Sequence, residues 1–262
     1  LSVLSTFYHG NLSYLFSLPL SVISFTDDKY NISSKIRFLV QFLSSYFIIT
    51  YSPFYRINAN LFNNKFDSFF VIFMSFFGTS IINFSNFMDG IDGLLAGCYS
   101  VTFFTIILKF KIFWLVPLLA GLLAFLKFNW EPSKIFMGDV GSTFLGLIYF
   151  SVILHINNFE DQLCVIFIMG PTFVDAFFTL IRRACCGELI FLPHKLHLYQ
   201  RLVANGWSHK RVSSIYILNS ILIALSFLCG GFYLCLSAFI LVCAIMYLLE
   251  LKQSKPFHVN SY

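Results

Sequence analysis

Apolar segments of near membrane-spanning length, separated by short polar loops, make up most of the chain. A helix needs about 20 apolar residues to cross the hydrocarbon core of a bilayer. Seven stretches come close to that length and two are shorter: residues 36–52, 68–86, 91–108, 112–128, 162–181, 212–230 and 232–250, and the shorter 12–26 and 142–156. The pattern predicts an all-α, polytopic integral membrane protein with about nine transmembrane helices, formed by one domain over residues 1–262.

The composition supports this prediction. Hydrophobic residues make up 58% of the 262 residues and charged residues 11%, whereas soluble domains carry about 25% charged residues. The first residue is Leu1, and no charged segment with a small-residue cleavage site follows it. We therefore expect either that the chain lacks N-terminal helices or that its numbering is shifted.

Lysines and arginines are distributed unevenly between the connecting loops. Such residues near helix ends stay on the cytoplasmic side of a membrane. If the loop that holds Asp89 is cytoplasmic and the connections alternate, the inner side holds all 17 lysines and arginines except Arg56, Lys65, Lys109 and Lys111. This asymmetry predicts that every polar motif of the chain faces the cytoplasm. The net charge of +5 reflects these inner loops and does not indicate nucleic-acid binding.

The most polar interruption of the apolar pattern runs from residue 83 to residue 94. It places two amides, two carboxylates and two glycines at the end of an apolar segment: Asn83, Asn86, Asp89, Gly90, Asp92 and Gly93. In a helix Asn83, Asn86 and Asp89 would share one face, and the glycines would let a ligand approach the backbone closely. Hard cations of the magnesium type take oxygen ligands from carboxylates and substrate phosphates. The stretch predicts a site for a divalent cation and a phosphate, and the alternative is a capped turn between two membrane helices.

A second polar motif follows the first apolar stretch. Asp27 and Asp28 are adjacent, so their carboxylates repel unless a cation is near, and Lys35, Arg37 or a metal could supply the positive charge. Lys35 would lie in the first turn of the next helix, where a positive charge interacts unfavourably with the helix dipole. A nearby anion such as a lipid phosphate would offset that cost. The alternative is a solvated loop of mixed charge.

Two more polar motifs follow later in the chain. Residues 138–142 form a small-residue turn that opens a helix, where Asp139 is expected to be the N-terminal cap, with an anion-binding helix start as the alternative. His194 and His197, three residues apart, would lie on one side of a helical turn in a basic loop that suits a diphosphate. A zinc site is the alternative there, although two neighbouring cysteines are poorly placed for tetrahedral ligation; its ligands would be Cys185, Cys186, His194 and His197. Asp175 lies deep in the preceding apolar segment and must find a partner or a polar cavity.

Taken in order, these four motifs resemble those of the polyprenyl-phosphate N-acetylhexosamine-1-phosphate transferases of the glycosyltransferase family 4 type. That family shares a superfamily with the bacterial phospho-N-acetylmuramoyl-pentapeptide transferase, and the resemblance runs from about residue 20 to about residue 215. It implies transfer of a sugar 1-phosphate from a UDP-N-acetylhexosamine, or a 6-deoxy relative, to undecaprenyl phosphate with release of UMP. The expected location is the cytoplasmic face of the bacterial inner membrane, at the first step of lipid-linked cell-surface polysaccharide synthesis.

The resemblance also implies roles for individual residues. The expected catalytic carboxylates are Asp27, Asp28, Asp89 and Asp92, with Mg²⁺ or Mn²⁺ bound by Asp89 and Asp92. The expected substrate-binding residues are Lys35 and Arg37 for the lipid phosphate, Asn83, Asn86, Asn129 and Asp139 around the donor, and His194, His197 and Arg201 for its diphosphate. The sequence leaves a homodimer open, as it does the choice between direct attack by the lipid phosphate and a two-step mechanism. A polytopic transporter of anionic lipid or sugar-phosphate is the rival function, although transporters usually place polar residues at the membrane midplane.

Overall fold

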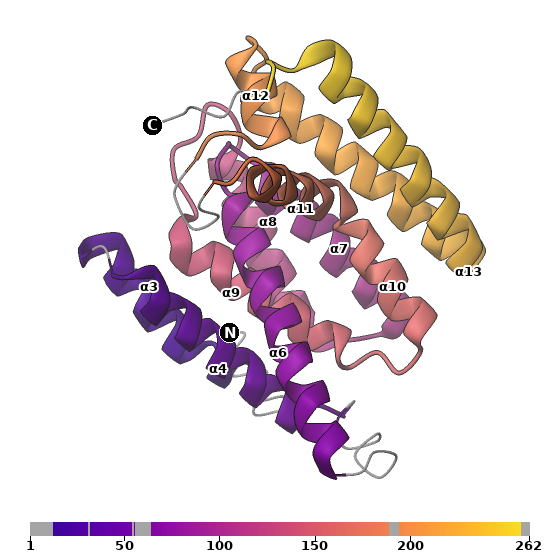
Figure 1. Ribbon diagram of the computed structural model, residues 1–262. Helices are drawn as coiled ribbons and strands as arrows, with labels where there is room; N and C mark the ends of the chain where they lie inside the picture. The colour runs from indigo at the N-terminus through magenta and orange to yellow at the C-terminus, as the bar shows by residue number, and fades with distance from the viewer. Residues whose placement is uncertain (1–12, 31, 54, 56–63, 189–193, 258–262) are drawn as a thin grey trace. The chain divides into compact units, whose positions relative to one another are not determined.

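The computed structural model describes residues 13–30, 32–53, 55, 64–188 and 194–257 (Figure 1). Regular secondary structure in these residues is helical throughout, which confirms the predicted all-α class. The helices are α2 (Ser13–Phe16), α3 (Leu18–Tyr30), α4 (Ser34–Tyr51), α6 (Asn64–Phe87), α7 (Leu94–Phe110), η1 (Phe113–Leu115), α8 (Val116–Asn129), α9 (Gly138–Ile153), α10 (Phe159–Ile168), α11 (Gly170–Cys185), α12 (Leu198–Ala204) and α13 (His209–Gln253).

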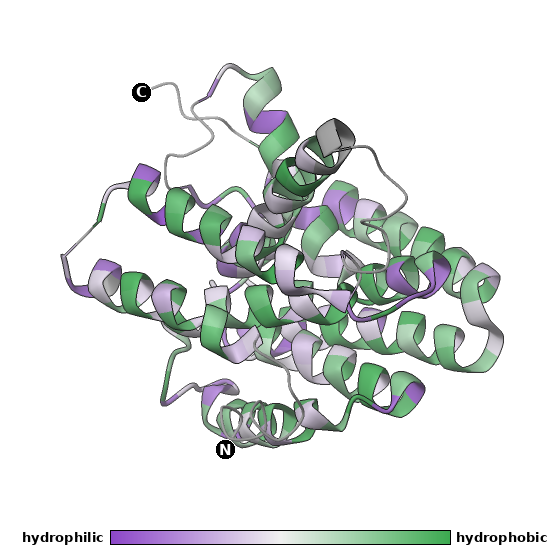
Figure 2. Ribbon diagram, turned by 90° about the horizontal axis from the view of Figure 1, so that it is seen from below, coloured by the Kyte–Doolittle hydropathy of each residue, from purple (hydrophilic) through white to green (hydrophobic). Residues whose placement is uncertain are grey.

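The helices are apolar along most of their length (Figure 2). By length and composition, two of the described helices can cross a membrane, namely α6 from Ser68 and α13, and the bent pair α10 and α11 can form a third span. Helices α7, α9 and η1 with α8 are apolar but shorter. The predicted apolar stretches are therefore helical, while the predicted number of about nine transmembrane helices remains a prediction.

The apolar stretch 162–181 does not form the single helix that its pattern predicts. Helix α10 ends at Ile168 and α11 begins at Gly170, and the two axes are bent by 78°. Pro171 lies in the first turn of α11, where its missing N–H costs no hydrogen bond but where it cannot continue a helix from the preceding residues. The break therefore follows from the Gly170-Pro171 pair.

Helix α13 consists of two limbs that fold back on each other at Gly231 (Figure 1). Gly231 has φ 68° and ψ −151°, a conformation that an L side chain disfavours. The limbs contact each other, because the Asn219 amide donates a hydrogen bond to Met246 Sδ at 3.6 Å. This break confirms the predicted boundary between residues 212–230 and 232–250.

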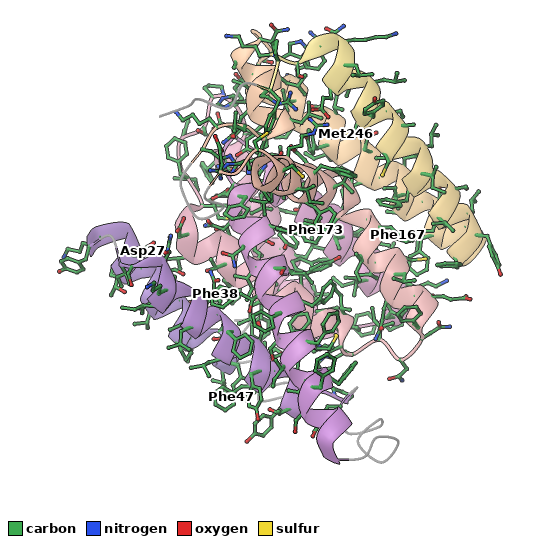
Figure 3. The ribbon with its side chains drawn as sticks, in the orientation of Figure 1. Asp27, Phe38, Phe47, Phe167, Phe173 and Met246 are labelled. Carbon is green, nitrogen blue, oxygen red and sulfur yellow. The ribbon has the colours of Figure 1, made fainter. Side chains whose placement is uncertain are left out.

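The chain divides into two compact units. The first comprises residues 1–86, 106–121 and 137–163, and the second comprises residues 87–105, 122–136 and 164–262. In the first unit α9 packs closely on α6, since a Cβ at Gly146 would lie 2.8 Å from Ile82 Cα. In the second, Phe167 of α10 stacks on Phe239 of α13 with ring centroids 4.4 Å apart (Figure 3). A small residue such as Gly146 lets two membrane helices approach closely.

Candidate active site

In the first unit, Arg37 of α4 joins two carboxylates from different helices. Its Nη1 donates to Asp27 Oδ2 at 2.5 Å and to Asp139 Oδ2 at 3.3 Å. Asp27 lies near the end of α3 (Figure 3), and its other oxygen accepts the Ile32 N–H at 2.7 Å. The cluster therefore holds one more carboxylate than guanidinium groups, while Lys35 nearby in sequence is exposed. The side chain of Asp28 lies outside the described residues.

Asp139 does not cap α9 as the sequence suggests. The N-cap position is Met137, and Asp139 lies in the first turn of the helix, where a negative charge is favourable near the helix dipole. Its Oδ1 accepts a hydrogen bond from Asn86 Nδ2 at 2.8 Å, and the same amide donates to Ser142 Oγ at 3.1 Å. The predicted site residues Asp27, Arg37, Asn86 and Asp139 thus meet in one cluster, which the sequence could not show.

Asn83 takes part in a separate contact of the same unit. Its amide donates to Gln41 Oε1 of α4 at 2.8 Å and to Thr79 O, one turn earlier in α6, at 2.9 Å. The predicted role of Asn83 near the donor remains a prediction.

In the second unit, the loop of residues 88–93 carries Asp89 and Asp92 between α6 and α7. Because α6 ends at Phe87, Asp89 lies beyond the helix, and the prediction that it shares a helical face with Asn83 and Asn86 is wrong. Asn129 fixes this loop: its Oδ1 accepts the Gly93 N–H at 3.0 Å, while its Nδ2 donates to Ile135 O at 2.9 Å. Asn129 is buried, and both the oxygen and the nitrogen of its side-chain amide are hydrogen-bonded to backbone groups.

The two glycines of this loop make room for aromatic side chains of the protein. A Cβ at Gly90 would lie 2.0 Å from Tyr199 Oη, and a Cβ at Gly93 would lie 2.7 Å from Trp130 Cε3. Gly93 also has φ +73°, which other residues disfavour. The sequence-based interpretation, in which these glycines admit a ligand, is therefore corrected, because protein side chains occupy that space.

Asp92 has a partner that the sequence analysis did not assign to the site. Its Oδ2 lies 3.3 Å from His209 Nδ1 and accepts the Ser133 N–H at 3.4 Å. The Ser213 hydroxyl donates to Asp92 O at 2.7 Å. The only signal in the sequence is that His209 closes the basic loop that contains His194 and His197.

His194 and His197 lie together, with ring centroids 4.7 Å apart. They precede α12, which begins at Leu198, so the predicted helical turn is not formed. His197 is buried and His194 is half-buried. Burial lowers the pKa of each imidazole to about 4, and the neighbouring arginine Arg183 adds to the effect on both. Both rings are therefore neutral at pH 7 in the structure without substrate.

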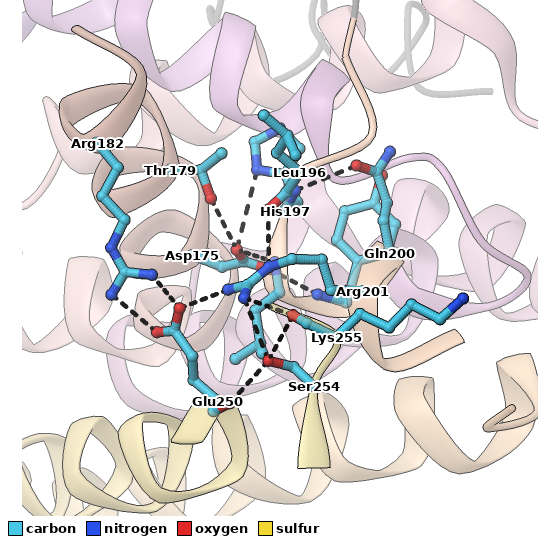
Figure 4. Close-up of polar contacts among 12 residues, drawn as sticks. Asp175, Thr179, Arg182, Leu196, His197, Gln200, Arg201, Glu250, Ser254 and Lys255 are labelled. Carbon is cyan, nitrogen blue, oxygen red and sulfur yellow. Dashed lines mark hydrogen bonds and ion pairs between the residues drawn. The ribbon is translucent and has the colours of Figure 1, made fainter. Parts of the chain in front are cut away.

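Arg201 of α12 is buried and bound by the protein (Figure 4). Its Nε donates to Leu196 O at 3.1 Å, its Nη1 donates to Ser254 Oγ at 3.2 Å, and its Nη2 donates to Glu250 Oε1 at 2.5 Å. Glu250 is also paired with Arg182. The predicted contact of Arg201 with a diphosphate would require part of this network to open, and it remains a prediction.

The donor groups of the second unit fit a magnesium-type ion better than zinc. Among the described residues, no three His, Cys, Asp or Glu side chains are grouped so as to hold a metal, so the alternative zinc site at Cys185, Cys186, His194 and His197 is not formed. Magnesium commonly uses one or two carboxylates together with water and substrate phosphates. Asp89 and Asp92, three residues apart on one short loop, would be the two carboxylates of such a site.

Helical architecture, apolar helices and clustered carboxylates together define a polytopic membrane protein with a polar site. Residues 12–157 match the model of glycosyl transferase family 4. The chain belongs to this family, as its motifs predict.

Three relatives support the assignment. The chain is 32% identical over 248 residues to the probable undecaprenyl-phosphate N-acetylglucosaminyl 1-phosphate transferase of Bacillus subtilis (strain 168), covering 87% of this chain and 68% of that protein. It is 32% identical over 163 residues to the decaprenyl-phosphate N-acetylglucosaminephosphotransferase of Mycobacterium tuberculosis (strain ATCC 25618 / H37Rv), covering 51% of this chain and 40% of that protein. It is 30% identical over 229 residues to the phospho-N-acetylmuramoyl-pentapeptide-transferase of Staphylococcus aureus (strain Newman), covering 76% and 69%.

Proposed function

We propose that the chain transfers a sugar 1-phosphate from a UDP-N-acetylhexosamine, or a 6-deoxy relative, to undecaprenyl phosphate and releases UMP. Two of the relatives are named for the transfer of an N-acetylglucosamine phosphate to a polyprenyl phosphate. The observation that carries the proposal is the loop of residues 88–93. It carries Asp89 and Asp92 between two hydrogen-bonded points of the backbone, Phe87 O bound by Tyr199 and Gly93 N–H bound by Asn129.

The reaction breaks one phosphoanhydride and makes another, so the protein must position two anions and neutralise their charge. At ~4 Å two like charges repel by about 4 kcal/mol at an effective dielectric constant of 20. Asp89 and Asp92 would hold Mg²⁺ or Mn²⁺, which when bound neutralises phosphate oxygens and polarises phosphorus. The side chains of the protein would position the two anions and neutralise the rest of their charge.

The Arg37 cluster is the proposed position of the lipid phosphate. Arg37 is shared between Asp27 and Asp139, so its charge is already offset, and an incoming phosphate needs a further cation. The exposed Lys35, two residues earlier and in the first turn of α4, would supply that charge. Asp27 and Asp28 would orient the lipid phosphate or take its proton.

His194 and His197 are proposed to contact the donor diphosphate. Neutral imidazoles still donate one hydrogen bond each, and a polyanion beside them favours their charged form.

The site is proposed to lie on the cytoplasmic side of a bacterial plasma membrane. There the enzyme would catalyse the first step in the synthesis of a lipid-linked polysaccharide.

The test is an assay of purified protein with undecaprenyl phosphate and a panel of UDP-sugars, with Mg²⁺, with Mn²⁺ and with EDTA. We expect UMP and a lipid-linked sugar phosphate in equal amounts from at least one donor. Failure to form any lipid-linked product with any donor would overturn the proposal. Movement of polyprenyl phosphate across vesicles without product would instead favour a transporter.

A further inference from the structure

Asp175 is a buried carboxylate of α11 to which neither the sequence analysis nor the proposed reaction gives a role. Its two oxygens accept hydrogen bonds from two backbone and two side-chain groups. Leu198 N–H donates to Oδ1 at 2.7 Å, and Tyr199 N–H donates to Oδ2 at 3.1 Å. The hydroxyls of Tyr216 and Thr179 donate to Oδ2 at 2.7 Å and to Oδ1 at 3.3 Å.

The two backbone donors are the first residues of α12. The first N–H groups of a helix have no partner within the helix, and a carboxylate there also interacts favourably with the helix dipole. Asp175, on a different helix, supplies the hydrogen-bond acceptor and the negative charge. It lies 23 and 24 residues before the two N–H groups in the chain. It therefore fixes where α12 begins and hence where the preceding His194–His197 segment lies (Figure 4).

Tyr199 carries this fixed position to the carboxylate loop. Its backbone is bound to Asp175, while its hydroxyl donates to Phe87 O at 2.9 Å. The same hydroxyl occupies the space that a side chain at Gly90 would need. Tyr199 thus contacts the loop of residues 88–93 at its start and again beside Asp89.

The histidine segment contacts the same aromatic groups. The His197 ring lies nearly parallel to the Tyr199 ring, at an angle of 11° with centroids 5.8 Å apart. It also stacks on Phe87, with centroids 5.9 Å apart. His197 Nδ1 lies 3.9 Å from Asp175 Oδ1.

We propose that Asp175 is a positioning residue that, through Tyr199, holds the His194–His197 segment and the Asp89–Asp92 loop in one register. This inference rests on the proposed function, because it makes both segments parts of one transfer site. It adds that a residue in an apolar helix sets their alignment without contacting substrate. A displacement of about 1 Å can reduce turnover about 100-fold, so a rigid link of this kind has a catalytic consequence.

The decisive variant is Tyr199→Phe, which removes only the hydroxyl that reaches Phe87 O. Tyr216→Phe is its matched control, since it removes a buried hydroxyl from the same carboxylate but leaves the contact with the loop. Backbone hydrogen exchange of the full chain, without substrate, reports whether residues 88–93 loosen. We expect faster exchange there in Tyr199→Phe and in Asp175→Asn, and wild-type exchange there in Tyr216→Phe.

Kinetics then test the consequence for the reaction. We expect kcat to fall about 10-fold in Tyr199→Phe, as for the loss of one hydrogen bond, and about 100-fold in Asp175→Asn, with KM for the UDP-sugar changing less than kcat. Tyr216→Phe should keep kcat within about 2-fold even if it lowers Tm. Unchanged exchange at residues 88–93 in Tyr199→Phe, or looser exchange with unchanged kcat, would overturn the inference. A wild-type protein inactive with every donor would instead overturn the proposed function, and the exchange result would still decide whether the link exists.

Discussion

His209 Nδ1 lies 3.3 Å from Asp92 Oδ2, although the two residues are 117 positions apart in the chain. The contact joins the start of α13 to the loop that carries both proposed metal ligands. The same Nδ1 accepts the Asp92 N–H at 3.5 Å, so the imidazole restricts the position of Asp92, as partners of metal ligands commonly do.

The first prediction follows from this pair. His209→Ala should lower kcat/KM for the UDP-sugar by about 10-fold, because partners of metal ligands typically contribute 10- to 100-fold. When activity is titrated with Mg²⁺, the variant should need a higher Mg²⁺ concentration to reach half of its maximal rate. The neighbouring exposed Lys210 provides the control, and Lys210→Ala should stay close to wild type. Equal effects of the two changes would remove His209 from the site.

The second prediction concerns the carboxylates themselves. Asp89→Asn keeps the size of the side chain and removes its charge, so turnover should be abolished while the protein still inserts and purifies. Asp92→Asn should be severe as well, and EDTA should stop the wild-type reaction until Mg²⁺ or Mn²⁺ is restored. Glu160→Gln, at an exposed position of α10, should leave turnover unchanged. Full activity of Asp89→Asn would contradict the metal assignment.

The third prediction is a dependence of stability on pH that arises at His197. Burial lowers its pKa from the ordinary value of 6.5 to about 4, so between these values the unfolded chain binds more protons than the folded one. This contribution to stability is present above pH 6.5 and is lost as the pH falls toward 4; at pH 5 the loss is about 2 kcal/mol.

Thermal unfolding in detergent at pH 7.5 and pH 5 provides the measurement. His197→Asn, which retains a good residue for the start of a helix, should show a smaller drop in Tm on acidification than the wild-type protein. An equal drop in both proteins would show that His197 is not the group that titrates.

The fourth prediction uses the contact between Gly90 and Tyr199. A methyl group at Gly90 would lie 2.0 Å from Tyr199 Oη, so Gly90→Ala must displace the ring or the loop, and kcat should fall at least about 10-fold. Combined with Tyr199→Phe it should lower kcat by less than the product of the two single losses, because the clashing oxygen is gone. Gly121→Ala, where a Cβ meets nothing within 4 Å, should be neutral or slightly stabilising. Strict additivity of the double variant would contradict a direct clash.

The fifth prediction concerns topology. In a variant that lacks the native cysteines, a cysteine introduced at Asn158 should react with a membrane-impermeant reagent added to intact cells. Cysteines at Ser133 and Asn205 should react only after the membrane is opened, because the basic residues concentrate on their side. Labelling of Ser133 or Asn205 in intact cells would place the site on the other face.

The helices, the family and most of the candidate residues could be predicted from the amino-acid sequence. A long apolar run excludes every backbone conformation in lipid that leaves N–H and C=O groups unpaired, so helices could be assigned from composition alone. Local breakers also acted predictably at Gly231. Gly170-Pro171 is a helix breaker of the same kind, although the apolar pattern of residues 162–181 predicts one continuous helix.

Contacts between side chains of distant segments could not be predicted in this way. The pairing of Asp92 with His209, the role of Tyr199 in filling the space at Gly90, and the binding of α12 by Asp175 all join segments far apart in the chain. Such contacts depend on how helices pack, and periodicity within one segment carries no information about its partner. For the same reason the residues next to Asp139 in the sequence predict a helix cap. Its actual partners, Arg37 and Asn86, come from two other helices.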